Sequence, residues 1–221
     1  MKPITETELV NYTKTEELLH TVTHGAGLIL SVLIAATCLA PAVRAGDALR
    51  IVCASLYLFG TTVMFLTSAL YHGTKPSKAK RILRLLDHCM IFFAVAGTAT
   101  GCVPPVRELV GLAPAVTLTV CAWFGAVSGL ILTFFSFERT KGLQMGLYIG
   151  TALCCAVAGG KTFTVLPRGA FMCFLGGSAA LLTGAVLYGV GKKKRWFHAV
   201  FHVFIDIGLT VFFIGIRKYC F

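Results

Sequence analysis

Seven long stretches without a charged side chain constrain this chain more than any other feature of its sequence. They cover residues 18–43, 51–74, 88–106, 109–137, 142–160, 169–191 and 196–216. Only the last is interrupted, by Asp206. A helix that crosses a bilayer needs about 20 apolar residues, so every stretch is long enough. Because the bilayer core offers backbone groups no water, each stretch is expected to be helical. The sequence predicts an all-α membrane protein, a seven-transmembrane helix bundle.

Composition agrees with this prediction and excludes several other classes. Charged residues make up 13% of the chain, whereas soluble domains have about 25%. A soluble enzyme, a disordered chain and a nucleic-acid-binding domain are therefore excluded. The nine cysteines form no Cys-x-x-Cys pair and lie mostly in apolar runs, so we interpret them as small apolar residues. We expect residues 1–17 to form an N-terminal segment and residues 18–221 a single membrane domain.

The distribution of lysine and arginine predicts the orientation of the bundle. If the connecting segments alternate between two sides, thirteen basic residues share the side of the N-terminus and seven lie on the other. Basic residues concentrate in cytoplasmic loops. We therefore expect a cytoplasmic N-terminus and an outside C-terminus. The cytoplasmic basic loops are expected to contact anionic lipid headgroups. No aromatic residues alternate with the basic ones, so we expect no nucleic-acid partner.

Ionisable side chains inside the predicted spans are candidates for function, because burying them in a bilayer is costly. They are His24, His72, Asp87, His88, His198, His202 and Asp206. The predicted orientation places all of them except Asp206 in the cytoplasmic leaflet. His20 is expected at the membrane interface, outside this group.

Three of these histidines are candidate metal ligands. His198 and His202 are four residues apart, so a helix presents both on one face. His72, from another helix, can supply a third ligand. Three histidines with one open position are typical of catalytic zinc, and the lack of thiolate ligands favours zinc over copper. Two alternatives stay open: histidines that each serve their own helix end, and a ligand set that includes His24 or His88.

The neighbouring polar residues each have more than one interpretation. Ser68 can bond a metal-bound water or a substrate oxygen, or its own helix backbone. Asp87 can cap a helix N-terminus, or act as a base or as a partner of a metal ligand. His88 points about 100° away from Asp87 on a helix, so one metal is not expected to use both. Asp206 can support a ligand, relay a proton, or pack in its protonated form.

Together, these residues carry a resemblance to a known family. The motifs, in chain order, are Thr23-His24-Gly25, Ser68-Ala-Leu-Tyr71-His72, Arg84-Leu-Leu-Asp87-His88, Ala96-Gly97-Thr98 and His198-Ala-Val-Phe-His202. From about residue 16 to residue 208, the chain resembles the hemolysin III branch of the progestin and adipoQ receptor (PAQR) family. That family lies within a wider superfamily of membrane hydrolases that includes alkaline ceramidases.

The resemblance implies roles for five residues. It makes His72, His198 and His202 the zinc ligands, Asp87 the carboxylate near a zinc-bound water, and Ser68 its polar partner. It also implies a seven-helix fold with the N-terminus inside, and the short termini resemble those of bacterial members, located in the cell (inner) membrane.

This chain departs from the family pattern at several positions away from the implied ligands. Ala99 and Gly101 replace a tyrosine and a proline of the family pattern. Asp206 stands where an apolar residue is common, and Phe212 where a further histidine is common. These departures affect inferences about substrate more than those about zinc.

The expected function is zinc-dependent hydrolysis of a lipid amide or ester, with a ceramide-like or phospholipid substrate. One alternative is a hemolysin-type protein that lyses membranes or forms pores. Another is a sensor of membrane state with a structural zinc ion. An open fourth coordination position would favour the enzyme, and a fourth protein ligand would favour the sensor.

Overall fold

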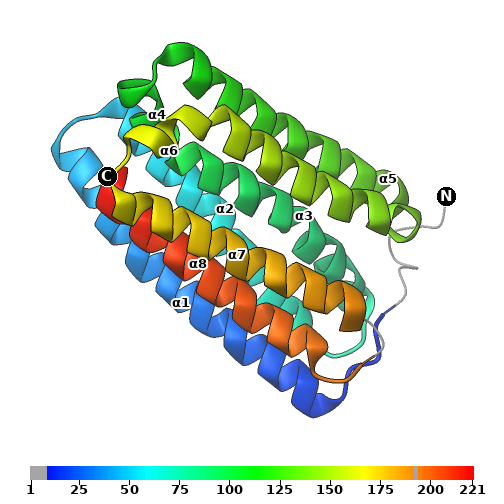
Figure 1. The fold of residues 1–221 in the computed structure, drawn as a ribbon. Helices are drawn as coiled ribbons and strands as arrows, with labels where there is room; N and C mark the ends of the chain where they lie inside the picture. The colour runs from blue at the N-terminus through cyan, green and yellow to red at the C-terminus, as the bar shows by residue number, and fades with distance from the viewer. Residues whose placement is uncertain (1–8, 192–193) are drawn as a thin grey trace.

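A computed structural model of the chain describes residues 9–191 and 194–221, and these residues form a helical bundle (Figure 1). The helices are α1 (Lys14–Arg44), α2 (Ala48–Gly73), α3 (Lys78–Gly101), α4 (Val103–Leu109), α5 (Leu112–Ala158), α6 (Gly160–Val165), α7 (Arg168–Gly191) and α8 (Phe197–Tyr219). Lys2, Lys192 and Lys193 of the basic count, and much of the predicted 1–17 segment, lie outside the described residues.

Helix α5 supplies two of the spans. Its 47 residues would extend for about 70 Å if straight, more than twice the ~30 Å hydrocarbon core of a bilayer. Instead α5 folds back on itself (Figure 1), giving the spans Leu112–Phe135 and Arg139–Ala158. The two halves pack tightly, because a Cβ on Gly125 would meet the side chain of Thr151.

The described residues thus contain seven helices long and apolar enough to cross a membrane, as predicted. Helices α1, α2, α3 and α5 pack in sequence, while α8 packs against both α1 and α7. Large apolar side chains point outward, including Val157 at 81% exposure and Val190 at 71%. Such surface suits lipid rather than water, and the chain is a multi-pass integral membrane protein. The orientation stays a prediction, although α1 begins and α8 ends at opposite ends of the bundle (Figure 1).

Helices α2 and α3 approach closely because each carries a glycine at their crossing. A Cβ on Gly97 would lie 2.8 Å from the carbonyl oxygen of Leu56, and one on Gly60 would meet the backbone of Phe93. Small residues allow this approach in membrane helices. The crossing holds the first half of α2 against the last turns of α3.

A capping box begins α1, as the spacing of Thr13 and Glu16 predicts. The backbone N–H of Thr13 donates to Glu16 Oε2 at 2.9 Å, and that of Glu16 donates to Thr13 Oγ1 at 3.3 Å. Glu16 also accepts a hydrogen bond from the backbone N–H of Trp196, at 3.3 Å, just before α8. The beginnings of α1 and α8 are therefore linked.

Candidate metal centre

The three predicted zinc ligands lie together where α2 ends and α8 begins. His72 belongs to the last turn of α2, and His198 and His202 to the first two turns of α8. His72 Nε2 lies 3.4 Å from His198 Nε2, which lies 3.1 Å from His202 Nε2. His72 and His202 are each only 2% exposed. The backbone thus brings three imidazoles together in a buried position.

These separations match those of ligands around one metal ion. Zinc–nitrogen bonds of about 2.0–2.1 Å in a tetrahedron put the ligand nitrogens about 3.3–3.4 Å apart. The two measured Nε2–Nε2 distances lie close to this value. Two of the three pairs therefore have the spacing of zinc ligands, whereas the group whose ligand atoms all lie within 4.8 Å of one another, and which could hold a metal ion, is His20, His72 and His198. The identity of the metal stays a prediction.

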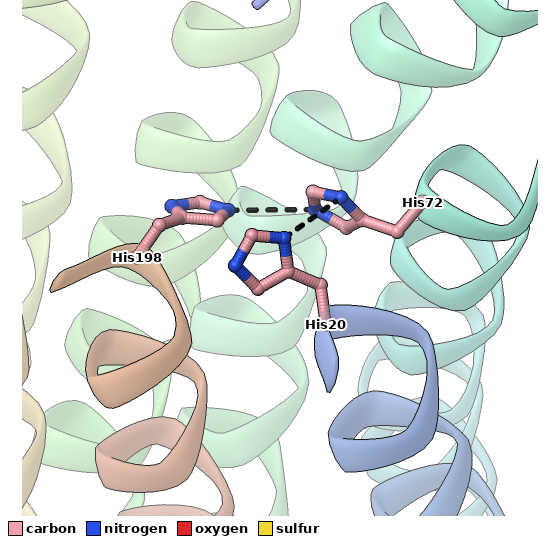
Figure 2. Close-up of side chains that lie close together, drawn as sticks. All are labelled: His20, His72 and His198. Atoms are coloured by element: carbon pink, nitrogen blue, oxygen red, sulfur yellow. Dashed lines mark hydrogen bonds between the residues drawn. The ribbon is translucent and has the colours of Figure 1, made fainter. Parts of the chain in front are cut away.

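The expectation that His20 lies outside the cluster was wrong. Its ring centroid lies 4.5 Å from that of His72, 4.7 Å from His198 and 5.0 Å from His202. Ligand nitrogens of His20, His72 and His198 all lie within 4.8 Å of one another (Figure 2). The first turns of α1 are packed against α2 and α8, so His20 lies inside the bundle and not at its interface with water.

Glu17, which the sequence analysis did not single out, holds His72 in place. Its Oε2 lies 2.7 Å from His72 Nδ1, and its Oε1 accepts a hydrogen bond from Lys80 Nζ at 2.7 Å. Lys80 is 3% exposed and also donates to the carbonyl oxygen of Thr74 at 2.9 Å. With the Nδ1 proton donated to Glu17, the lone pair of Nε2 points toward His198. This carboxylate–histidine pairing is typical of metal sites.

A pattern in the sequence could have revealed both residues. Glu17, His20, His24, Gly27 and Ser31 are spaced by three or four positions, so they share one face of α1. A face of polar and small residues on an otherwise apolar helix indicates a buried polar contact. Lys80 carried no such signal, because it lies in a basic segment typical of a cytoplasmic loop.

His24 and His88 are arranged differently from the cluster. His24 stacks face to face on His202, with centroids 3.6 Å apart and planes at 10°. Neither of its ring nitrogens has a hydrogen-bond partner within residues 9–191 and 194–221. Rings stacked in parallel do not direct their nitrogens at one common point. His88 packs against Phe137 at 4.7 Å, and its carbonyl oxygen accepts a hydrogen bond from Tyr148, so it faces α5.

Asp87 does not cap a helix, so that interpretation was wrong. Helix α3 begins at Lys78, and Ser77 caps it. Ser68 approaches Asp87 from α2, but its buried Oγ has no hydrogen-bond partner of normal geometry among the described residues. Asp87 interacts electrostatically with Tyr12 and Tyr71.

These two tyrosines border the histidines. Tyr12 stacks on His198 with centroids 5.2 Å apart, and the Tyr71 ring lies 4.5 Å from that of His72. Burial raises the pKa of the Tyr12 phenol, so the ring that covers His198 is uncharged at neutral pH.

Asp206 lies one helical turn beyond His202, next to α1. A Cβ on Gly27 would lie 2.8 Å from Asp206 Oδ1, and this oxygen is buried and has no hydrogen-bond partner in the part of the chain that the structure describes. Its described contacts include no histidine nitrogen.

The fold and the site define an integral membrane protein with seven spans and a buried histidine cluster that could hold a metal ion. The family model described as haemolysin-III related matches residues 12–213, and the chain belongs to that family. It is 28% identical over 216 residues to the hemolysin-3 homolog of Bacillus subtilis (strain 168), covering 95% of this chain and 96% of the relative. It is 27% identical over 221 residues to hemolysin-3 of Bacillus cereus, covering 96% and 95%.

Proposed function

We propose that this chain is a zinc-dependent hydrolase of lipid amides or esters, with His72, His198 and His202 as the zinc ligands. The observation that carries the proposal is the spacing of their Nε2 atoms, 3.4 Å and 3.1 Å. The donors are neutral imidazoles in a buried site, and Glu17 orients one of them. Imidazole donors of this kind suit zinc.

A zinc ion bound there would polarise a carbonyl group and lower the pKa of a water molecule in an open position. The chain's own residues supply the other parts of the chemistry. Asp87 accepts the proton of the attacking water, and the Ser68 hydroxyl donates a hydrogen bond to the developing oxyanion. Tyr12 and Tyr71 border the cluster and limit the access of other water molecules.

Lipids are the proposed substrates because of where the cluster lies. It is buried among helices whose outer surfaces are apolar, so a substrate with an acyl chain would lie beside these helices in the bilayer. With the predicted orientation, entry is from the cytoplasmic leaflet. With the same orientation, Arg81 near the beginning of α3 and Arg139 at the beginning of the second span of α5 would face the anionic headgroups of that leaflet.

The variant Asp87→Asn tests the hydrolase, because asparagine keeps the size of the side chain and removes its basicity. The variant should fold, retain zinc and lose about 10²–10⁴-fold in turnover. Zinc content and cleavage of fluorescent ceramide and phospholipid analogues are measured on both purified proteins. Full activity in a zinc-loaded variant excludes Asp87 as the base, and a wild type inactive on both lipid classes contradicts the hydrolase.

Membrane lysis is the second candidate, because two relatives bear the name hemolysin-3. Release of a trapped dye from liposomes, measured on the same two proteins, separates the candidates. Equal release by wild type and Asp87→Asn, without lipid cleavage, supports lysis. A zinc-bound protein that neither cleaves nor releases supports the sensor.

A further inference from the structure

The His20 ring contacts all three of the predicted zinc ligands. Its centroid lies between 4.5 and 5.0 Å from those of His72, His198 and His202. Figure 2 shows its ring beside the space between His72 and His198. It comes from α1, whereas the other three come from α2 and α8. His20 therefore approaches the cluster from a third helix.

The two ring nitrogens of His20 differ in their contacts. Its Nδ1 lies 3.3 Å from His72 Nδ1, while its Nε2 is buried and has no hydrogen-bond partner among the described residues. The residue is 0% exposed, so water does not compensate for the missing bond. A buried polar atom without a partner is unfavourable. A metal ion held by the neighbouring imidazoles would supply the missing partner.

Residues on both sides fix His20 in this position. Glu17, one turn earlier on α1, bonds His72 and Lys80 and so holds α1 against α2 and α3. Tyr12 packs edge-on against the His20 ring, with centroids 4.8 Å apart, while it stacks on His198. His20 cannot leave the cluster unless the chain around Tyr12 and the first turns of α1 also move.

We infer that His20 supplies a fourth imidazole ligand and closes the metal site of the resting protein. The ligand nitrogens of His20, His72 and His198 already lie within 4.8 Å of one another. A tetrahedral zinc site has ligand nitrogens about 3.3 Å apart, so the inference requires the His20 ring to turn its Nε2 toward the other ligand nitrogens when the metal binds. The inference rests on the proposed zinc site and adds a form of regulation to it: His20 withdraws during turnover and leaves the open position that hydrolysis requires. A fourth imidazole in the resting protein therefore does not by itself favour the sensor.

The number of imidazole ligands can be measured directly on the full-length protein in detergent. X-ray absorption of the zinc-loaded wild type should show four imidazoles, and His20→Ala should show three. In the cobalt-loaded proteins, azide should leave the visible spectrum of the wild type unchanged and shift that of His20→Ala. His24→Ala is the matched control, because it removes a buried histidine that stacks on His202, and it should behave as wild type.

Three imidazoles in the wild type, or an azide-induced shift in the wild type as large as that in His20→Ala, would overturn the inference. The count in the wild type decides the question even if His20→Ala does not fold, and His20→Gln provides a second variant with a polar side chain. A failure of the proposed hydrolase function would give a different set of results. A wild type with four imidazoles and a His20→Ala variant that opens to azide but cleaves no lipid would refute the hydrolase and retain His20 as a ligand.

Discussion

The link from Glu17 to His72 can be tested by removing the charge of Glu17. In Glu17→Gln, the side chain keeps its size but no longer fixes the proton of His72 on Nδ1. Loss of such a partner typically lowers metal affinity by about 10–100-fold, which corresponds to about 1.4–2.7 kcal/mol. The 2.7 Å separation and the 0% exposed side chain of His72 place the expected loss at the upper end of this range.

The same substitution also removes the ion-pair partner of Lys80. Breaking a buried ion pair costs about 3–5 kcal/mol. Glu17 is 20% exposed, and Lys80 keeps its bond to the Thr74 carbonyl, so we expect a smaller loss of stability, about 1–3 kcal/mol. The double variant Glu17→Gln/Lys80→Met removes both charges and should recover most of this stability without recovering metal affinity.

Competition with a zinc chelator gives the affinity, and thermal unfolding in detergent gives the stability. Glu16→Gln is the matched control, because Glu16 bonds Thr13 and the backbone of Trp196 but no histidine. It should bind zinc as the wild type does. If the double variant also binds zinc as tightly as the wild type, the carboxylate has no role in orienting His72 and the reasoning fails.

Three further predictions concern ligation, packing and orientation. His72→Ala, His198→Ala and His202→Ala should each lose most bound zinc in metal analysis of the purified protein, and equal zinc in the wild type and the triple variant would exclude the site. Gly97→Val should lower the unfolding temperature strongly, because its Cβ would lie 2.8 Å from a backbone oxygen. Gly150→Val is the control and should not, because its Cβ would have nothing within 4 Å. Equal unfolding temperatures of the two variants would contradict the close crossing of α2 and α3. A reporter active only in the cytoplasm should be silent after Phe221 and active at Lys193, and the reverse pattern would refute the orientation.

The spans were predictable from the sequence because every segment that crosses the hydrocarbon core must be apolar, helical and about 20 residues long. The pairing of His198 with His202 was equally accessible, since it depends only on helical spacing. That His72 joins them from another helix was a hypothesis about topology, and the structure places the three nitrogens together.

The burial of His20 and Lys80 was not predictable from the sequence, because it depends on how the helices pack over the end of the bundle where α1 begins. His20 and Lys80 look like residues of an interface and of a basic loop, because hydropathy locates the boundary of a span but not its burial. The beginning of α1 is instead covered by Tyr12 and linked to α8 through Glu16. Two polar residues near the end of a span thus become part of the interior, which only the packing of α1, α2 and α8 determines.

The contacts at the cluster also define an order of assembly during synthesis. Glu17, His72 and Lys80 lie within the first 80 residues, so their link can form as soon as α3 begins to enter the membrane. The contact between Thr23 and His202 spans 179 residues, which a ribosome translates in roughly 10–35 s. Until then, half of the imidazoles in the cluster are missing. If the cluster holds a metal ion as proposed, loading would be the last event of biogenesis, and a chain that stalls before α8 is inserted would remain unloaded, unlike a finished protein.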